Sequence, residues 1–193
     1  MTSASSTSSA AATTSAEVPG VKETLRQTIP PNAFLCFSQP SGTGTATPAT
    51  VADPVAPRLT ITVPDGWTSV PGSGEVALLL TGPSGMSGTV IIAATPLGPA
   101  EAFDKYADDV AAKAALSSIN VRPAEFCGYS SQELFGTLSD SPAETVEFAD
   151  RITHIWTNTT SYLVAVHMQG PRGTAAFDDA KTVLMADFAI VIP

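Results

Sequence analysis

The clearest alternation of apolar and polar residues runs over residues 58–63, where three aliphatic side chains are separated by threonines. Such alternation makes one face of a strand apolar, and both residue types have high β-propensity. Pro64-Asp65-Gly66 then ends the strand with residues typical of a turn. Trp67 follows the turn directly. We therefore expect a strand that stops at a proline turn, and a Trp67 side chain anchored in the core.

Continuous apolar runs and a short polar connection predict further strands. Residues 76–80 and 89–94 are apolar without alternation, as expected of strands covered on both faces. Residues 145–157 and 162–168 flank the polar segment 158–161, which is typical of a β-hairpin. The remaining strand predictions are a strand or buried loop over 34–37, one or two strands within 121–138, and a terminal strand over 190–192.

Three segments repeat apolar residues at helical spacing. The first predicts a short helix over Val21–Ile29, which Pro30-Pro31 stops. The strongest pattern spans residues 99–116, where Pro99 suits the first helical turn. The last predicts a helix over residues 174–187.

This order of elements predicts an α+β fold, with an antiparallel or mixed sheet of about six or seven strands and helices packed on both faces. Residues 38–57 are rich in Gly, Thr, Pro and Ser, and we expect them to form a long surface loop. Residues 1–17 are mostly Ser, Thr and Ala, so they bury too little apolar surface to offset their ordering entropy. We expect a disordered tether over 1–17 and a single domain over 18–193.

The charge balance excludes some classes of partner. The 193 residues include 9 Lys and Arg against 18 Asp and Glu, a formal net charge of −9. This balance argues against binding nucleic acid, or an anionic membrane surface through a basic patch. The sequence also lacks a phosphate-loop motif and a metal-spaced cysteine pattern, so we expect no cofactor.

Cys36 and Cys127 are the two cysteines of the chain. An even, small number of cysteines fits a single disulfide in an oxidising compartment. Such a bridge would close a long loop and contribute about 4 kcal/mol in the chain-entropy description. We expect the bridge, and the alternative is two buried free thiols.

Residues 127–132, Cys-Gly-Tyr-Ser-Ser-Gln, resemble the nucleophile elbow of cutinase-like esterases. That elbow needs Gly-x-Ser-x-Gly because its strained turn leaves no room for a side chain two residues after the serine. Here Gln132 follows Ser130 at that distance. Asp150 and His167 could complete the order of a catalytic triad, whereas the alternative is an ordinary serine in a strand or loop.

The two histidines lie on the two strands of the predicted hairpin. With a turn of two or four residues, His154 would lie opposite Ala165 and share a sheet face with His167 and Asp150. An Asp/His/His group could bind zinc or move a proton. A three-residue turn would place the histidines on opposite faces. The alternative is a pair of half-exposed strand histidines.

Four aromatic residues are candidates for binding an apolar ligand: Trp67, Phe103, Tyr106 and Trp156. The core is rich in alanine and poor in aromatic residues, so a void could remain between the helix over 99–116 and the sheet. Such a void would accept an acyl chain. The alternative is that each of these side chains belongs to an ordinary core.

The layout resembles the LpqN/LpqT-type lipoproteins of mycobacteria, whose domains resemble the Mog1/PsbP fold. A Ser/Thr/Ala-rich tether precedes a short helix, and Val63-Pro64-Asp65-Gly66-Trp67 is similar to the Val-Pro-x-x-Trp of that family. A helix follows Gly98-Pro99, and a final helix rich in Asp and Ala precedes a strand over 189–192. The resemblance covers roughly residues 18–193.

The resemblance implies an extracytoplasmic protein of an actinobacterial cell envelope, secreted or anchored to the outer face of the plasma membrane. The anchor would be an N-terminal lipid that this chain does not carry. It also implies binding of an envelope lipid, or of an envelope or host protein, rather than catalysis, and it supplies no catalytic residues. The alternative function is a secreted cutinase-like serine esterase.

Overall fold

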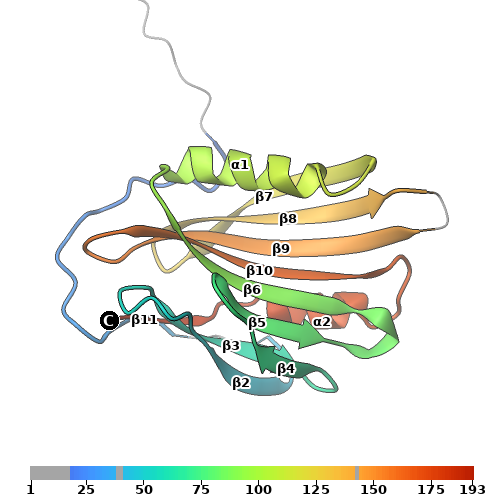
Figure 1. The fold of residues 1–193 in the computed structure, drawn as a ribbon, viewed down its shortest axis with the longest axis horizontal. Coiled ribbons are helices and arrows are strands. Elements are labelled where there is room, and N and C mark those ends of the chain that lie inside the picture. The colour runs from blue at the N-terminus through green and yellow to red at the C-terminus, as the bar shows by residue number, and fades with distance from the viewer. Residues whose placement is uncertain (1–17, 38–40, 142–143) are drawn as a thin grey trace, which may run out of the picture.

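The computed structural model describes residues 18–37, 41–141 and 144–193. They form three layers: helix α1, a seven-stranded sheet, and a third layer that contains a four-stranded sheet and helix α2 (Figure 1). This is the α+β architecture expected from the sequence, with its helices on opposite faces of the larger sheet. The predicted tether over 1–17 lies outside the described residues.

The larger sheet is antiparallel throughout, with strand order β4-β5-β6-β10-β9-β8-β7. Its strands are β4 (Thr68–Pro71), β5 (Val76–Thr81), β6 (Ser87–Thr95), β7 (Leu116–Phe126), β8 (Tyr129–Ser139), β9 (Thr145–Trp156) and β10 (Ser161–Pro171). The hairpin predicted from residues 145–168 is the β9–β10 pair. Its connection holds four residues, because Trp156 pairs with Ser161.

The smaller sheet has strand order β1-β11-β3-β2 and is also antiparallel. Its strands are β1 (Ala33–Cys36), β2 (Gly44–Ala49), β3 (Arg58–Pro64) and β11 (Ala189–Ile192). The sequence predicted one sheet, whereas the strands divide between two. At the predicted proline turn the chain passes from β3 in the smaller sheet to β4 in the larger sheet.

Two helices cover opposite faces of the larger sheet. Helix α1 (Pro99–Ala111) packs against β7, β8 and β9 through Phe103 and Val110, which are buried. Helix α2 (Phe177–Leu184) packs against β3 and β10. A short 3₁₀ turn, η1 (Pro83–Gly85), connects β5 to β6. Each helix is shorter than the sequence pattern predicted.

The prediction of a helix over Val21–Ile29 is wrong. This segment has no regular secondary structure and runs as an extended strap, which we define as residues 19–30. The Ser131 amide donates to the Gly20 carbonyl, and the Asn158 side chain bonds both backbone groups of Ile29. Contacts with distant strands therefore replace the backbone hydrogen bonds that a helix would form. A helix of this length is only marginally stable unless it packs extensively against the rest of the protein.

The prediction of one long loop over 38–57 is also wrong. Its central residues 44–49 form β2, which pairs with β3 along its whole length. Threonine and alanine are compatible with a strand, and Pro48 lies on an edge strand where a missing amide is tolerated. The high content of turn residues concealed the strand.

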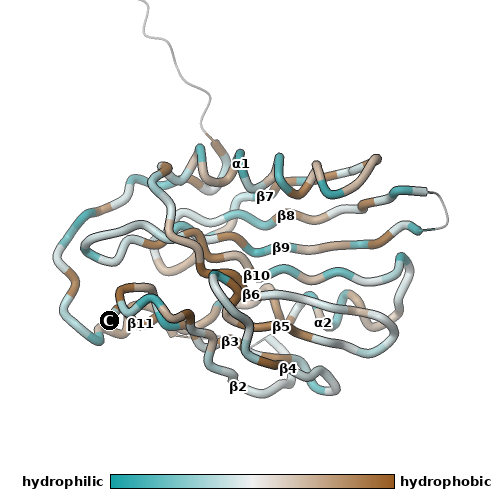
Figure 2. The backbone as a smooth tube through the Cα atoms, in the orientation of Figure 1, coloured by the Kyte–Doolittle hydropathy of each residue, from teal (hydrophilic) through white to brown (hydrophobic). Residues whose placement is uncertain are grey.

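Strands β5 and β6 were predicted to be covered on both faces, and this is wrong. One face is buried against the smaller sheet, as Leu78 and Val90 show. On the other face Leu79 is 44% exposed and Ile91 is only half-buried. Helix α1 packs over β7 to β9 and so leaves this face of β5 and β6 open. Figure 2 shows the hydrophobic positions along these two strands.

The turn after β3 is built as the sequence predicted. The Trp67 amide donates to the Pro64 carbonyl, and Gly66 has a positive φ of 79°. The Trp67 side chain is buried in the core between the sheets. Its indole lies against the backbone of Gly82, where a Cβ atom would come within 2.4 Å of the ring. The tryptophan therefore anchors the turn on the core.

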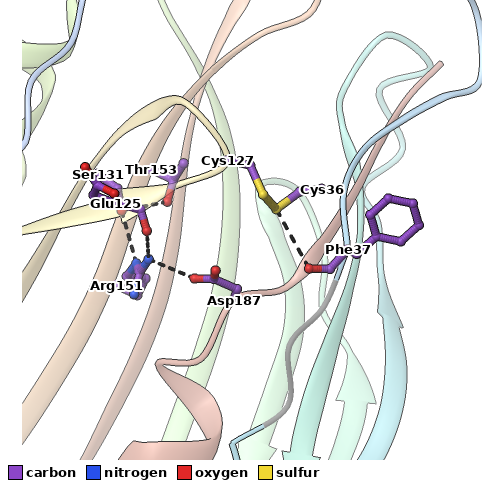
Figure 3. Close-up of a disulfide and its surroundings, with 8 residues drawn as sticks. All are labelled: Cys36, Phe37, Glu125, Cys127, Ser131, Arg151, Thr153 and Asp187. Carbon is purple, nitrogen blue, oxygen red and sulfur yellow. Dashed lines mark hydrogen bonds and ion pairs between the residues drawn. A yellow bond between two sulfur atoms is a disulfide. The ribbon is translucent and has the colours of Figure 1, made fainter.

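The predicted disulfide between Cys36 and Cys127 is present (Figure 3). It joins the end of β1 in the smaller sheet to the β7–β8 turn in the larger one, with 5.7 Å between the Cα atoms. The bridge links residues 91 positions apart and ties the two sheets together. The turn itself needs a left-handed backbone at both Cys127 and Gly128, which is typical of a two-residue hairpin turn.

Candidate ligand pocket

A pocket of about 640 Å³ lies between α1 and the part of the larger sheet that α1 leaves open. Its floor is the outward face of β6 and β10, and one wall is the side of α1. The floor is formed by four apolar residues: Ile91, Ala93, Leu163 and Ala165. The wall contains Ala102, Tyr106 and Val110. The volume falls within the range of small-molecule sites in proteins.

The register of β6 and β10 explains why the floor is apolar. Ile91 pairs with Ala165, and Ala93 pairs with Leu163. These four side chains lie on one sheet face because they follow the period of two along each strand. Two of the four are alanines, so the floor is low and leaves space beneath α1.

The rim of the pocket carries charge. Lys105 and Asp109 lie one helical turn apart on α1, and their Nζ and Oδ2 atoms are 2.9 Å apart. Both side chains are 62% exposed, so this pair contributes little to stability. Lys113 and Glu75 also line the mouth. A ligand in the pocket would therefore have an apolar body against the sheet and meet charged groups at the opening.

A buried polar group lies below Tyr106. Asp150 is fully buried, and its Oδ1 atom accepts a hydrogen bond from His167 Nδ1. Its other oxygen has no hydrogen-bond partner among the described residues. Burial raises the pKa of Tyr106 well above its ordinary value, and the nearby Asp150 carboxylate raises it further. The Tyr106 hydroxyl therefore stays protonated near neutral pH.

The four aromatic residues proposed as ligand contacts do not share one cavity. Tyr106 lines the pocket, whereas Phe103 is buried beneath α1 in the core. Trp67 lies in the core between the two sheets, on the other side of the larger sheet. Trp156 lies at the end of β9, beside the strap. The predicted void between the helix and the sheet is present, but only one of the four side chains reaches it.

The two histidines share a sheet face with Asp150, but the three groups do not converge. His154 pairs with Leu163, not with Ala165 as predicted, and His167 pairs directly with Asp150. His154 is four residues from Asp150 along β9, which places it roughly 13 Å away. No group of three or more His, Cys, Asp or Glu residues that could hold a metal ion occurs in the described ranges.

The serines at the start of β8 lack the setting of a nucleophile elbow. Ser130 follows the two-residue turn of a β-hairpin, not a turn from a strand into a helix. Its hydroxyl donates to the Lys22 carbonyl and accepts from the Lys22 amide. Ser131 points to the opposite face, where its hydroxyl donates to the Ile152 carbonyl. Neither hydroxyl is arranged beside the Asp150–His167 pair.

Most residues of the pocket were not predicted from the sequence. Small residues such as Ala93 and Ala165 carry no chemical signal, and charged residues such as Lys105 and Asp109 are typical of any exposed helix face. The available signal was the run 89–94, whose odd-numbered residues would have shared one face.

Among the described residues, no helix is long and apolar enough to cross a membrane.

No protein-family model matches this sequence, and no curated protein matches it. Among solved structures, the chain is similar to the crystal structure of LpqN, described as involved in cell envelope biogenesis of Mycobacterium tuberculosis. The TM-score is 0.59 at 18% identity, over 76% of this chain and 91% of that chain. The chain is also similar to the solution structure of cyanobacterial PsbP (CyanoP) from Synechocystis sp. PCC 6803. That match has a TM-score of 0.46 at 15% identity, over 75% of this chain and 89% of that chain.

The similarity to LpqN confirms the fold expected from the sequence. The class is an α+β domain with antiparallel sheets and a helix on each face of the larger sheet. Within that class, the chain has the fold of LpqN.

Proposed function

We propose that this chain is a non-catalytic domain of the cell envelope that binds the apolar chain of a lipid between α1 and the larger sheet. The observation that carries the proposal is the open apolar floor formed by β6 and β10. Apolar residues on a sheet face of a soluble domain are normally covered by another element. Here Ile91 and Leu163 are only half-buried, and a pocket of about 640 Å³ stands over them.

The chemistry of the pocket supports a lipid over a polar metabolite. The floor offers no hydrogen-bonding side chain, so a polar ligand would lose its contacts with water without compensation. An alkyl chain gains instead, by about 25 cal/mol for each Å² of apolar surface removed from water. The charged groups at the mouth, Lys105 and Asp109 among them, would face the polar head of such a molecule.

An extracytoplasmic location is supported by the disulfide. Disulfides persist mainly in oxidising compartments and are rare in the cytosol. The solved structure with the same fold, LpqN, is described as involved in cell envelope biogenesis. We propose that residues 1–17 act as a tether that holds the domain near an envelope membrane. A cutinase-like esterase is not supported, because Ser130 lies on a hairpin and both its hydrogen bonds go to the strap.

Titration with cis-parinaric acid tests the proposal, since this fatty acid fluoresces strongly only in an apolar site. We expect saturable binding by the wild-type chain. Ala93→Phe fills the floor of the pocket and should weaken binding at least tenfold. Ala100→Phe is the matched control, because Ala100 is a half-buried alanine of α1 that does not line the pocket.

The control variant should bind as the wild type does. Near-ultraviolet circular dichroism and the melting temperature would establish that both variants are folded. Equal binding by Ala93→Phe and the wild type would place the ligand elsewhere. Absence of saturable binding by the wild type would remove the lipid proposal and direct attention to a protein partner.

A further inference from the structure

The edge strands of the two sheets differ in how their free edges are protected against pairing. Strand β1 has four residues and a bulge between Phe34 and Cys36, and β4 has four residues and ends at Pro71. Strand β2 contains Pro48, whose nitrogen cannot donate a hydrogen bond. Short length, bulges and prolines all keep an edge from pairing with another chain. Strand β7, at the other side of the larger sheet from β4, is longer, with eleven residues (Figure 1).

The strap closes one half of β7 and leaves the other half open. Gly20 of the strap lies so close to Pro123 that a Cβ atom on the glycine would come within 3.2 Å of the Pro123 Cα atom. We define the open edge as residues 116–122, which form no backbone hydrogen bond to described residues outside β7 and β8. All of them are exposed except Ile119, which is half-buried. Every second residue of such an edge directs its amide and carbonyl groups into solvent.

The open edge lacks the charges that normally prevent pairing. Exposed edge strands often carry lysine or another charged residue that blocks the approach of a second strand. Residues 114–121 have no charged side chain. Leu116 is 67% exposed and Val121 is 44% exposed. Ile119 and Val121 also have high β-propensity. The open edge is therefore suited to receive another strand.

A second copy of this chain fits the open edge because the edge is complementary to itself. In an antiparallel pair of two β7 strands centred on Ile119, Ser117 lies opposite Val121 of the second copy. Ser118 lies opposite Asn120 of the second copy, and both are polar. Each contact occurs twice, as a twofold axis through the interface requires. No two like charges lie opposite each other in this register.

The same register brings opposite charges together at both ends of the paired strands. Arg122 of one copy lies opposite Leu116 of the other. Asp140 is adjacent to Leu116, since its Oδ1 atom accepts from the Ala115 amide at 2.9 Å. The guanidinium of each copy therefore approaches the Asp140 carboxylate of the other. This attraction offsets part of the repulsion between two chains that each carry a net charge of −9.

We propose that two copies of this chain form a dimer in which their open edges pair antiparallel about Ile119 and join the two larger sheets into one. Pairing over residues 116–122 is small for a protein interface, so the dimer is weak and depends on concentration. The proposal is independent of lipid binding, because none of the residues of the open edge lines the pocket beside α1.

Sedimentation velocity of the full chain, from micromolar to millimolar concentration, measures the association. We expect a reversible monomer–dimer equilibrium. Ser117→Lys/Val121→Lys places ammonium groups opposite one another across the paired edges and should weaken the dimer at least tenfold. The matched control is Thr68→Lys/Val70→Lys, which makes the same kind of change at two exposed positions of β4. The control should dimerise as the wild type does.

These measurements can overturn the proposal without relying on a variant. A wild-type chain that remains monomeric at all concentrations would exclude the dimer and leave the edge to an extended segment of another protein. A dimer that the β7 substitutions do not weaken, or that both double variants weaken equally, would place the interface elsewhere. Near-ultraviolet circular dichroism would establish that both variants are folded.

A cross-linking experiment tests the register. Opposed residues of paired strands have Cα atoms about 5 Å apart, which a disulfide can span. Ser118→Cys and Asn120→Cys chains, mixed in a glutathione buffer, should therefore form a mixed disulfide dimer on non-reducing gels. Each variant alone places its new thiols two residues out of register, beyond disulfide reach, and should cross-link at least tenfold less. Equal cross-linking by the separate and mixed variants would contradict pairing about Ile119.

Discussion

Asp150 accepts a hydrogen bond from His167 across the β9–β10 pair, directly beneath the face that α1 covers. The carboxylate is fully buried, whereas the imidazole is 12% exposed. A buried carboxylate without a partner is costly, so His167 holds a polar group that the core would otherwise exclude. This pair therefore stabilises the face of the larger sheet that lies against Tyr106 of α1.

Removal of one member of this pair should be strongly destabilising. We expect His167→Ala to lower the free energy of unfolding by about 3 kcal/mol, because Asp150 then remains buried without its donor. The double variant Asp150→Leu/His167→Leu should recover most of the loss, since both polar groups are replaced by apolar ones. Urea unfolding monitored by circular dichroism measures both. A double variant less stable than His167→Ala would contradict this role.

Arg151 occupies the opposite face of β9 and connects it to the segment before β11 (Figure 3). Its side chain is 6% exposed and donates to Asp187 and to the carbonyls of Met185 and Glu125. We expect Arg151→Met to destabilise the chain by about 3 kcal/mol, because these acceptors lose a buried donor.

The comparison for Arg151 is Arg122, whose side chain is 58% exposed and which pairs with Glu133, a half-buried carboxylate that also bonds Arg151. Arg122→Met should cost less than about 1 kcal/mol, because the Arg122 side chain is exposed and Glu133 keeps its bond to Arg151. Thermal unfolding of the two variants side by side gives the comparison. Equal losses would mean that the Arg151 contacts do not hold the β11 segment.

The Cys36–Cys127 disulfide closes a loop of 91 positions and joins the two sheets. In the chain-entropy description, such a bridge stabilises a protein by about 4 kcal/mol. We expect the double variant Cys36→Ser/Cys127→Ser to show a loss of this order in urea unfolding. Reduction of the wild type under non-denaturing conditions should give the same unfolding midpoint as the variant. A reduced chain as stable as the oxidised one would show that packing alone joins the sheets.

The three tyrosines predict a loss of stability at alkaline pH. Burial raises the pKa of Tyr129 to about 12, and burial is also the main cause that raises the pKa of Tyr106 and of Tyr162. Because each folded value lies above the ordinary value of 10.0, the unfolded chain loses these protons first. Stability should therefore fall as the pH rises above 10.

Ultraviolet absorbance of tyrosinate measures this effect. At pH 10 the native chain should contain almost no tyrosinate, whereas the urea-unfolded chain should be about half ionised. On further increase of pH, ionisation should coincide with loss of the circular dichroism signal. Free ionisation of all three tyrosines at pH 10 in the native chain would contradict their burial.

The sequence predicted the strands wherever side-chain pattern alone determines them. Alternation over 58–63, the turn at Trp67 and the 145–168 hairpin are local features, and each is present. The strap was mispredicted because Val21, Leu25 and Ile29 do repeat at helical spacing. What decides the segment is its bonding to Ser130, Ser131 and Asn158, which lie more than 100 residues away.

The pocket could be predicted in position but not in composition. A core rich in alanine indicated a void between the helix and the sheet. Which residues line that void depends on how far α1 extends across the sheet, and no local pattern encodes this offset. Phe103 and Tyr106 are one turn apart on α1, yet one is buried in the core and the other faces the pocket.

Native mass spectrometry of the chain purified from an actinobacterial host tests the central proposal most directly. We expect the wild type and Ala100→Phe to retain a lipid adduct that dissociates under denaturing conditions. Ala93→Phe, in which the floor of the pocket is filled, should be isolated without it. Bare wild-type chain, or an adduct retained equally by Ala93→Phe, would contradict a lipid site between α1 and the larger sheet.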